Sequence, residues 1–192
     1  MTNSTRLLAT CGLAAGLILG QAGLAHAATF TVNPTQVFLS ARVTSALISL
    51  RNESQEPLRF QLTLQAWDQR PNGEMALSPT RDVIFFPQLL ALAVGEERKV
   101  RVALASPAPS GGAERTYRLF VEELPPSQSQ APQQGVKVLT KMGIPIFVQP
   151  PAPMAKPALQ DLSSTGGRLA FTVANGGNAH FVPWWVGPER WA

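Results

Sequence analysis

The sequence is poor in the residues from which most enzyme and metal sites are built. It contains one cysteine, Cys11, and two histidines, one near the N-terminus and the other His180. It also lacks a Gly-x-Ser-x-Gly motif, a zinc-ligand spacing and a phosphate-binding loop. Catalysis needs a positioned nucleophile, a tunable base or a metal cluster. We therefore expect no catalytic residues, no metal site and no cofactor.

Runs of like charge and late hydrophobic runs are also missing. The 16 lysines and arginines are scattered among 12 aspartates and glutamates. Binding to nucleic acid normally requires a basic patch, so nucleic acid is excluded as an expected partner. After position 27, no apolar run approaches the roughly 20 residues that span a bilayer, so stable membrane insertion is not expected.

The first 27 residues have the order of a secretory signal peptide. Arg6 precedes an apolar run over 7–24, and a small-x-small processing site follows at 25–27. A retained membrane anchor is the alternative, but glycines and polar residues interrupt the run. Cleavage after residue 27 would remove Cys11 and leave a chain with a formal charge of +3 and no disulfide. The product is expected to be soluble and exported.

Short segments with a two-residue hydrophobic period make up most of the remaining chain, and none sustains the helical period of 3.6. The predicted strands are 29–39 (broken at Asn33-Pro34), 44–52, 58–67, 82–92, 99–105, 116–124 and 135–150. Seven short strands without a cysteine pair predict an all-β fold, an immunoglobulin-like seven-stranded β-sandwich. A small barrel is the alternative.

Proline-rich segments divide the chain further. A polar stretch at 125–134 is predicted to be a loop, so that the domains are a signal peptide (1–27), an immunoglobulin-like domain (28–150), a linker (151–157) and a partial second β-domain (158–192). The last part offers two strands, near 159–162 and 166–175, and is too small for a core of its own. Three of the four tryptophans, Trp184, Trp185 and Trp191, lie at its end. A truncated or frame-shifted C-terminus and a genuine aromatic patch are both compatible with this ending.

The predicted strand 135–150 poses a question. Its alternate residues from Val136 to Val148 share one face, which is apolar apart from Thr140, and Pro145 lies inside it. Proline cannot donate a ladder hydrogen bond and is tolerated mainly at edges or bulges. A long apolar edge strand is normally an aggregation liability.

Two pairs of adjacent acidic residues do not suggest catalysis. Glu122 and Glu123 follow each other on a predicted strand, so their side chains point to opposite faces. Glu96 and Glu97 fall in a predicted turn. Both pairs are interpreted as solvated charge.

Several segments, in this order, resemble one protein family. The segments ERTYRLFVEELPP (114–126) and IPIFVQP (144–150), joined by a variable loop, look like the F1 and G1 strands of periplasmic pilus-assembly chaperones. TFTVNPTQVFLSA (29–41) is similar to their first strand, and 80–102 resembles the D1 to E1 region of their archaic branch, which includes spore-coat-type systems. The resemblance implies a non-enzymatic chaperone of the chaperone-usher pathway.

The resemblance also implies a purpose for the edge strand. Members of the family lend their G1 strand to a pilin or fimbrial subunit whose sandwich lacks one strand. On this interpretation the donor residues are Val136, Val138, Thr140 and Met142. From alternation alone, the alternative is that these side chains face the chain's own core.

The family further anchors the subunit's C-terminal carboxylate with basic residues. Gln36 and Pro145 stand where those basic residues would fall, so the usual pair is absent. Arg118 and Lys141 are the nearest alternatives, although both could be ordinary solvated charges.

The short second domain puts one implied partner in doubt, the outer-membrane usher that receives subunits from these chaperones. Two alternatives to the chaperone hypothesis remain. One is an immunoglobulin-like structural or adhesive subunit of a surface fibre, and the other is an inactive, truncated chaperone copy.

Overall fold

The computed structural model describes residues 29–70, 72–107, 112–126 and 138–182. The predicted signal peptide, most of the predicted loop at 125–134, Val136 and the three C-terminal tryptophans lie outside the described residues. The described part contains strands and no helix. Among these residues, no helix has the length and hydrophobicity needed to cross a membrane.

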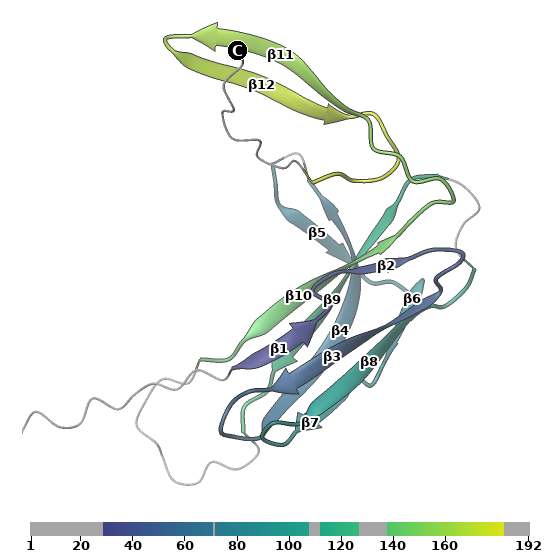
Figure 1. Ribbon diagram of the computed structural model, residues 1–192, viewed down its shortest axis with the longest axis vertical. Helices are drawn as coiled ribbons and strands as arrows, with labels where there is room; N and C mark the ends of the chain where they lie inside the picture. The colour runs from purple at the N-terminus through teal and green to yellow at the C-terminus, as the bar shows by residue number, and fades with distance from the viewer. Residues whose placement is uncertain (1–28, 71, 108–111, 127–137, 183–192) are drawn as a thin grey trace, which may run out of the picture.

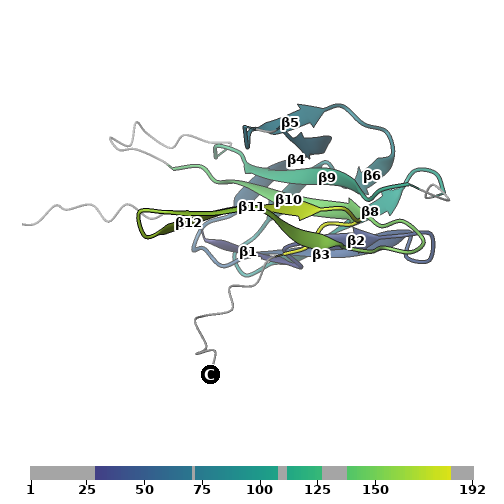
Figure 2. The ribbon, with the colours of Figure 1, turned by 90° about the horizontal axis from the view of Figure 1, so that it is seen from above.

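Two β-sheets pack face to face and form a sandwich (Figures 1 and 2). The first sheet has the order β1-β3-β8-β6, and the second has the order β2-β10-β9-β4-β5, with β7 also paired to β4. The strands are β1 (Phe30–Asn33), β2 (Val37–Leu39), β3 (Ser45–Asn52), β4 (Leu58–Gln69), β5 (Met75–Ser78), β6 (Val83–Phe86), β7 (Leu89–Leu92), β8 (Glu97–Leu104), β9 (Arg115–Glu123) and β10 (Lys141–Val148). The predicted all-β, immunoglobulin-like sandwich is confirmed.

The core lies between the two sheets and follows the alternation of the sequence. Alternate residues of each central strand point inward, because successive side chains of a strand lie on opposite faces. Its fully buried side chains include Leu39, Ile48, Leu50, Phe60, Leu62, Val100, Leu119 and Ile146. Burial of this apolar surface is the main free energy that holds the sheets together.

Each of the seven predicted segments contains a strand, but two of them are broken. The segment 29–39 divides into β1 and β2 at the predicted Asn33-Pro34 break, and the two halves join different sheets. The segment 82–92 divides at Phe86-Pro87 into β6 and β7, which likewise belong to different sheets. Strand β5 was not predicted. The burial of its four residues does not alternate, so no two-residue hydrophobic period predicts a strand there.

The two predicted strands near the C-terminal end correspond to a hairpin, β11 (Pro157–Thr165) and β12 (Arg168–Asn175), which forms a separate two-stranded sheet (Figure 1). Leu159 lies opposite Val173 in its register, and Leu169 and Phe171 share the Val173 face by alternation. All four side chains are exposed. Within the described residues, this hairpin has an apolar face that no other strand covers.

Tyr117 links the sandwich to the loop before β6. Its ring is buried in the core, and its hydroxyl donates a hydrogen bond of 2.8 Å to the Asp82 carboxylate. Burial first, and then the hydrogen bond to Asp82, raise the pKa of the Tyr117 phenol to about 12. Folding therefore favours the neutral phenol.

The raised pKa of Tyr117 predicts a loss of stability in alkali. In the unfolded chain the phenol titrates near pH 10. The contribution of Tyr117 is therefore fully present below pH 10 and is lost as the pH rises towards 12. We expect urea unfolding to show a loss of about 2–3 kcal/mol across this range from this residue. In Tyr117→Phe that component should disappear, and an identical pH dependence in both proteins would contradict the assignment.

Candidate functional site: the open edge of strand β10

Strand β10 has one fully paired edge and one that is mostly open. Strand β9 pairs with it in antiparallel register along its whole length, from Lys141 opposite Glu122 to Val148 opposite Arg115. On the other edge, β2 pairs in parallel only with Ile146 to Val148. Within the described residues, no strand covers the edge from Lys141 to Pro145.

The hydrogen-bond pattern shows which backbone groups face that open edge. The Glu123 N–H donates to the Thr140 carbonyl at 2.9 Å, so the even-numbered residues turn their backbone groups to β9. The Gln149 N–H donates to the Leu39 carbonyl of β2 at 2.8 Å, so the odd-numbered residues face the other edge. Pro145 therefore removes an N–H from the open edge and none from the β9 ladder. This explains why proline is tolerated inside this strand.

The predicted donor face runs from solvent into the core. Val138 is 61 % exposed, Thr140 is half-buried, and Met142 packs against the margin of the core. The next residues of the same face, Ile144 and Ile146, are buried in the sandwich. One strand therefore presents side chains to solvent at its start and supplies the core at its end.

The two candidate anchor residues lie on the opposite, outward face of this sheet. The Lys141 ammonium forms an ion pair with the Glu122 carboxylate at 2.8 Å and lies 5.3 Å from the centre of the Phe120 ring. The Arg118 guanidinium lies 4.5 Å from the centre of the Trp67 ring. Its Nε is buried and has no hydrogen-bond partner among the described residues.

Gly143 makes room for the Arg118 side chain. A Cβ atom at Gly143 would lie 2.8 Å from Arg118 Cδ and 3.3 Å from a carbon of the Phe120 ring. Side chains on neighbouring strands cannot approach so closely, so glycine lets the stem of Arg118 lie against the backbone of β10.

The structure does not bring Arg118 and Lys141 together. Arg118 is opposite Pro145 in the register, and Lys141 is four residues away along β10, a separation of about 13 Å. Gln36 directly precedes β2, whose first residue Val37 lies opposite Ile146. The predicted linker follows the C-terminal end of β10, so Arg118, opposite Pro145, lies nearer to the linker than Lys141 does.

The interpretation of Glu123 as solvated charge is wrong. The prediction that Glu122 and Glu123 point to opposite faces holds, since Glu122 reaches Lys141. However, Glu123 is only 3 % exposed and does not carry solvated charge. Its carboxylate accepts a hydrogen bond of 3.2 Å from the Thr140 N–H. The sequence held a signal for this, because Glu123 shares its parity with the core residues Leu119 and Val121.

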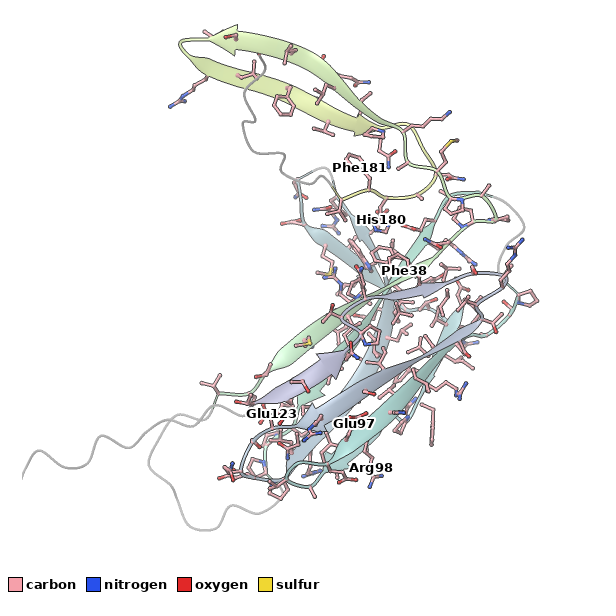
Figure 3. All side chains as sticks on the ribbon, in the orientation of Figure 1. Phe38, Glu97, Arg98, Glu123, His180 and Phe181 are labelled. Carbon is pink, nitrogen blue, oxygen red and sulfur yellow. The ribbon has the colours of Figure 1, made fainter. Side chains whose placement is uncertain are left out.

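The chain after β12 returns to the sandwich and packs on the outward face beside β10 (Figure 3). The His180 ring stacks on Phe147 of β10 at 4.1 Å and lies 6.2 Å from Phe38 of β2. Its Nδ1 donates to the nearly buried carboxylate of Glu114. His180 therefore attaches the segment after β12 to the sandwich. We call this set of contacts the joint.

Two asparagines complete this joint. The Asn178 N–H donates to the Met154 carbonyl at 2.9 Å, and its side-chain oxygen accepts from the Met154 N–H at 2.7 Å. Asn175 accepts from the Lys156 N–H at 3.0 Å. The Glu114 N–H donates to the Asn178 carbonyl at 2.7 Å, which ties the sandwich to the same segment.

Comparisons with known proteins identify the family and relatives of the fold. A family model for the N-terminal domain of PapD, described as a pili and flagellar-assembly chaperone, matches residues 29–153. No curated protein sequence matches the chain significantly. Among the solved structures that match, three illustrate the similar fold, although their sequences are only distantly similar to this one.

The first is a chain of the CsuC–CsuE chaperone–tip adhesion subunit complex from the archaic Csu pili of Acinetobacter baumannii, with 22 % identity and a TM-score of 0.61, covering 78 % of this chain and 73 % of that one. The second is the class 5 fimbriae chaperone CfaA, with 16 % identity and a TM-score of 0.58, covering 78 % and 68 %. The third is a chain of the Salmonella enterica SafA pilin–SafB chaperone complex, with 14 % identity and a TM-score of 0.52, covering 77 % and 83 %.

The joint predicts that His180 holds the returning segment against the sandwich. In His180→Ala, the stacking on Phe147 and the side-chain hydrogen bond to Glu114 are both lost, while the backbone N–H of residue 180 can still donate to Glu114. We expect the Asn178 amide to exchange with solvent about tenfold faster in NMR hydrogen exchange, because a hydrogen bond to a charged group contributes about 1.5–3 kcal/mol. His180→Phe keeps the stacking and should give an intermediate rate. Unchanged exchange at Asn178 in His180→Ala would show that the asparagines hold the joint alone.

Proposed function

Since the chain belongs to the family of pili and flagellar-assembly chaperones, we propose that it caps fibre subunits by lending them the first half of strand β10. The observation that supports this most directly is the open edge from Lys141 to Pro145, which continues at its N-terminal side into the exposed Val138. The family is one of non-enzymatic chaperones. Its members in the chaperone-usher pathway work in the periplasm.

Strand donation would use both the backbone and the side chains of β10. The backbone groups of Lys141 and Gly143 face the open edge and can pair with an edge strand of the subunit, as in other cases of β-augmentation. The side chains of Val138, Thr140 and Met142 would enter the subunit's exposed core, as would the predicted donor Val136. Burial of one such apolar side chain contributes about 1.5–3 kcal/mol.

Pro145 would set the end of this pairing. It has no N–H to offer to an incoming strand, and β2 occupies the edge directly after it. The subunit's strand is therefore limited to the backbone groups before Pro145, which defines the length over which donation can occur.

For the subunit's terminal carboxylate, the proposed anchor is Arg118, with Lys141 as a second basic residue. Arg118 offers a buried Nε that has no partner within the part of the chain that the structure describes, and Gly143 leaves space for its stem against the sheet. Lys141 is exposed and already paired with Glu122. Arg118 is therefore the stronger candidate, because a charge-assisted hydrogen bond in a partly desolvated place is stronger than an exposed ion pair.

Export and delivery complete the proposal. The segment 1–27 would direct the chain to the periplasm as a cleaved signal peptide, and the outer-membrane usher would receive the capped subunits. Release would require no nucleotide, since the free energy comes from the subunit's completed folding. The alternative of a structural fibre subunit is not favoured, because the described sandwich has its last strand, β10, in place.

Strand donation predicts that a charge at Val138 prevents subunit capture. The mature chain is co-expressed with pilin-like subunits and recovered through an affinity tag. Val138→Asp, alone and with Val136→Asp, should lower the recovered complex at least about tenfold, because it would bury an unpaired charge in an apolar groove. Leu47→Asp, on the outward face of the other sheet, is the matched control. Capture that survives the substitutions at 138 and 136 would argue against donation by β10.

The proposed anchor predicts a dependence on the subunit's C-terminus. Arg118→Ala should weaken capture of a subunit with a free C-terminal carboxylate by about tenfold or more, because one charged hydrogen bond contributes about 1.5–3 kcal/mol. Lys141→Ala should have a smaller effect, and Lys99→Ala on the other sheet should have none. A subunit extended at its C-terminus should bind wild type and Arg118→Ala equally. If Arg118→Ala weakens capture of both subunits equally, Arg118 does not act on the C-terminal carboxylate.

A further inference from the structure

Glu123 is a buried acidic residue. The packing of the hydrophobic core does not explain it, and the proposed carboxylate anchor does not use it. It is the last residue of β9 and is only 3 % exposed. In the register it lies opposite Phe60 of β4, a core residue. A carboxylate in such a place is expected to have hydrogen-bond partners that offset the loss of water. Figure 3 shows it at the end of the sandwich from which β10 starts.

Its partner is the residue directly before β10. Glu123 and Thr140 exchange two hydrogen bonds: the Glu123 N–H donates to the Thr140 carbonyl at 2.9 Å, and the Thr140 N–H donates to Glu123 Oε2 at 3.2 Å. The paired register of the two strands ends one residue later, at Lys141 opposite Glu122. The side-chain carboxylate therefore extends the ladder beyond the last regular pair.

The Glu123–Thr140 contact determines which way the backbone groups of the neighbouring residues point. Because both backbone groups of Thr140 are turned to β9, those of Leu139 and Lys141 are turned to the open edge. The Val138 and Thr140 side chains are thereby kept on the face that continues into Met142 and the core. A slip of one residue would turn all of these side chains to the other face.

We propose that Glu123 is a positioning residue for strand donation. Its carboxylate holds the Thr140 N–H and keeps the exposed start of the donor strand in its register before a subunit arrives. The inference rests on the proposed function, because positioning matters only if this segment is donated. A segment held in its bound conformation loses less conformational entropy on binding.

The experiment compares Glu123→Leu, which removes the acceptor at similar size, with Glu123→Gln, which retains a side-chain oxygen. In the full mature chain without subunit, the Thr140 amide should exchange about tenfold faster in Glu123→Leu, and about as in wild type in Glu123→Gln. Subunit capture should fall about three- to tenfold in Glu123→Leu, because one or two side chains must then be ordered on binding. Glu123→Gln should restore it.

Glu97→Leu serves as the control, since Glu97 lies exposed on the other sheet. It should leave both the Thr140 exchange and the capture unchanged. Urea unfolding of each variant separates a local effect from a general loss of stability. Should Glu123→Leu fail to fold, Glu123→Met removes the acceptor with a more flexible apolar side chain and should lower capture to a similar extent.

The outcomes are distinguishable. Wild-type exchange at Thr140 in Glu123→Leu, or faster exchange with unchanged capture, overturns the positioning role and leaves strand donation intact. Two further results would also overturn it. One is wild-type capture by Glu123→Met, and the other is a Glu123→Gln chain that behaves like Glu123→Leu. If the wild-type chain captures no subunit, the proposed function fails, and the role of Glu123 in donation fails with it.

Discussion

The antiparallel pairing of β9 with β10 is the interaction on which the rest of the structure depends. Its register decides which residues of β10 point into the core, which lie on the outward face, and which backbone groups remain on the open edge. A shift by one residue would expose Ile144 and Ile146 and bury Lys141, which the hydrophobic effect strongly opposes. The buried half of β10 therefore fixes the geometry of its exposed half. A strand of which only one half is packed can be firmly held and still have an edge free for another chain.

Much of this arrangement could be predicted from the sequence. Alternation from Val138 to Val148 indicated the common face, and Pro145 indicated an edge, because a proline within a central strand would remove a ladder bond. Alternation does not predict at which residue of that face the buried core ends. This depends on the length of β9 and on how far β4 extends beside it. The burial of Glu123 was predictable from its parity, but the acidic side chain suggested solvent instead.

Other features depended on contacts that are distant in sequence. The separation of Arg118 and Lys141 follows from the register of β9 and β10, and no local sequence pattern encodes that register. The division at Pro87 into strands of different sheets requires knowledge of both partners, β8 and β4. The contact of His180 with Phe147 joins parts of the chain that a proline-rich linker separates. Proline, glycine and alternation identify strands reliably, whereas the partners of a strand are set by tertiary packing.

An open, partly apolar edge strand normally invites uncontrolled association, and β10 limits this risk with the same residues that shape its proposed use. Lys141 places a charge beside the edge, Pro145 removes one of its donors, and β2 covers the last three residues of the strand. The remaining edge is short, so a chance partner gains few backbone hydrogen bonds there. A specific partner would gain the same few bonds and, in addition, the burial of Val138 and its neighbours in a groove of matching spacing. Selectivity at this edge would therefore come mainly from the side chains, and backbone pairing alone would be too weak to hold a wrong partner.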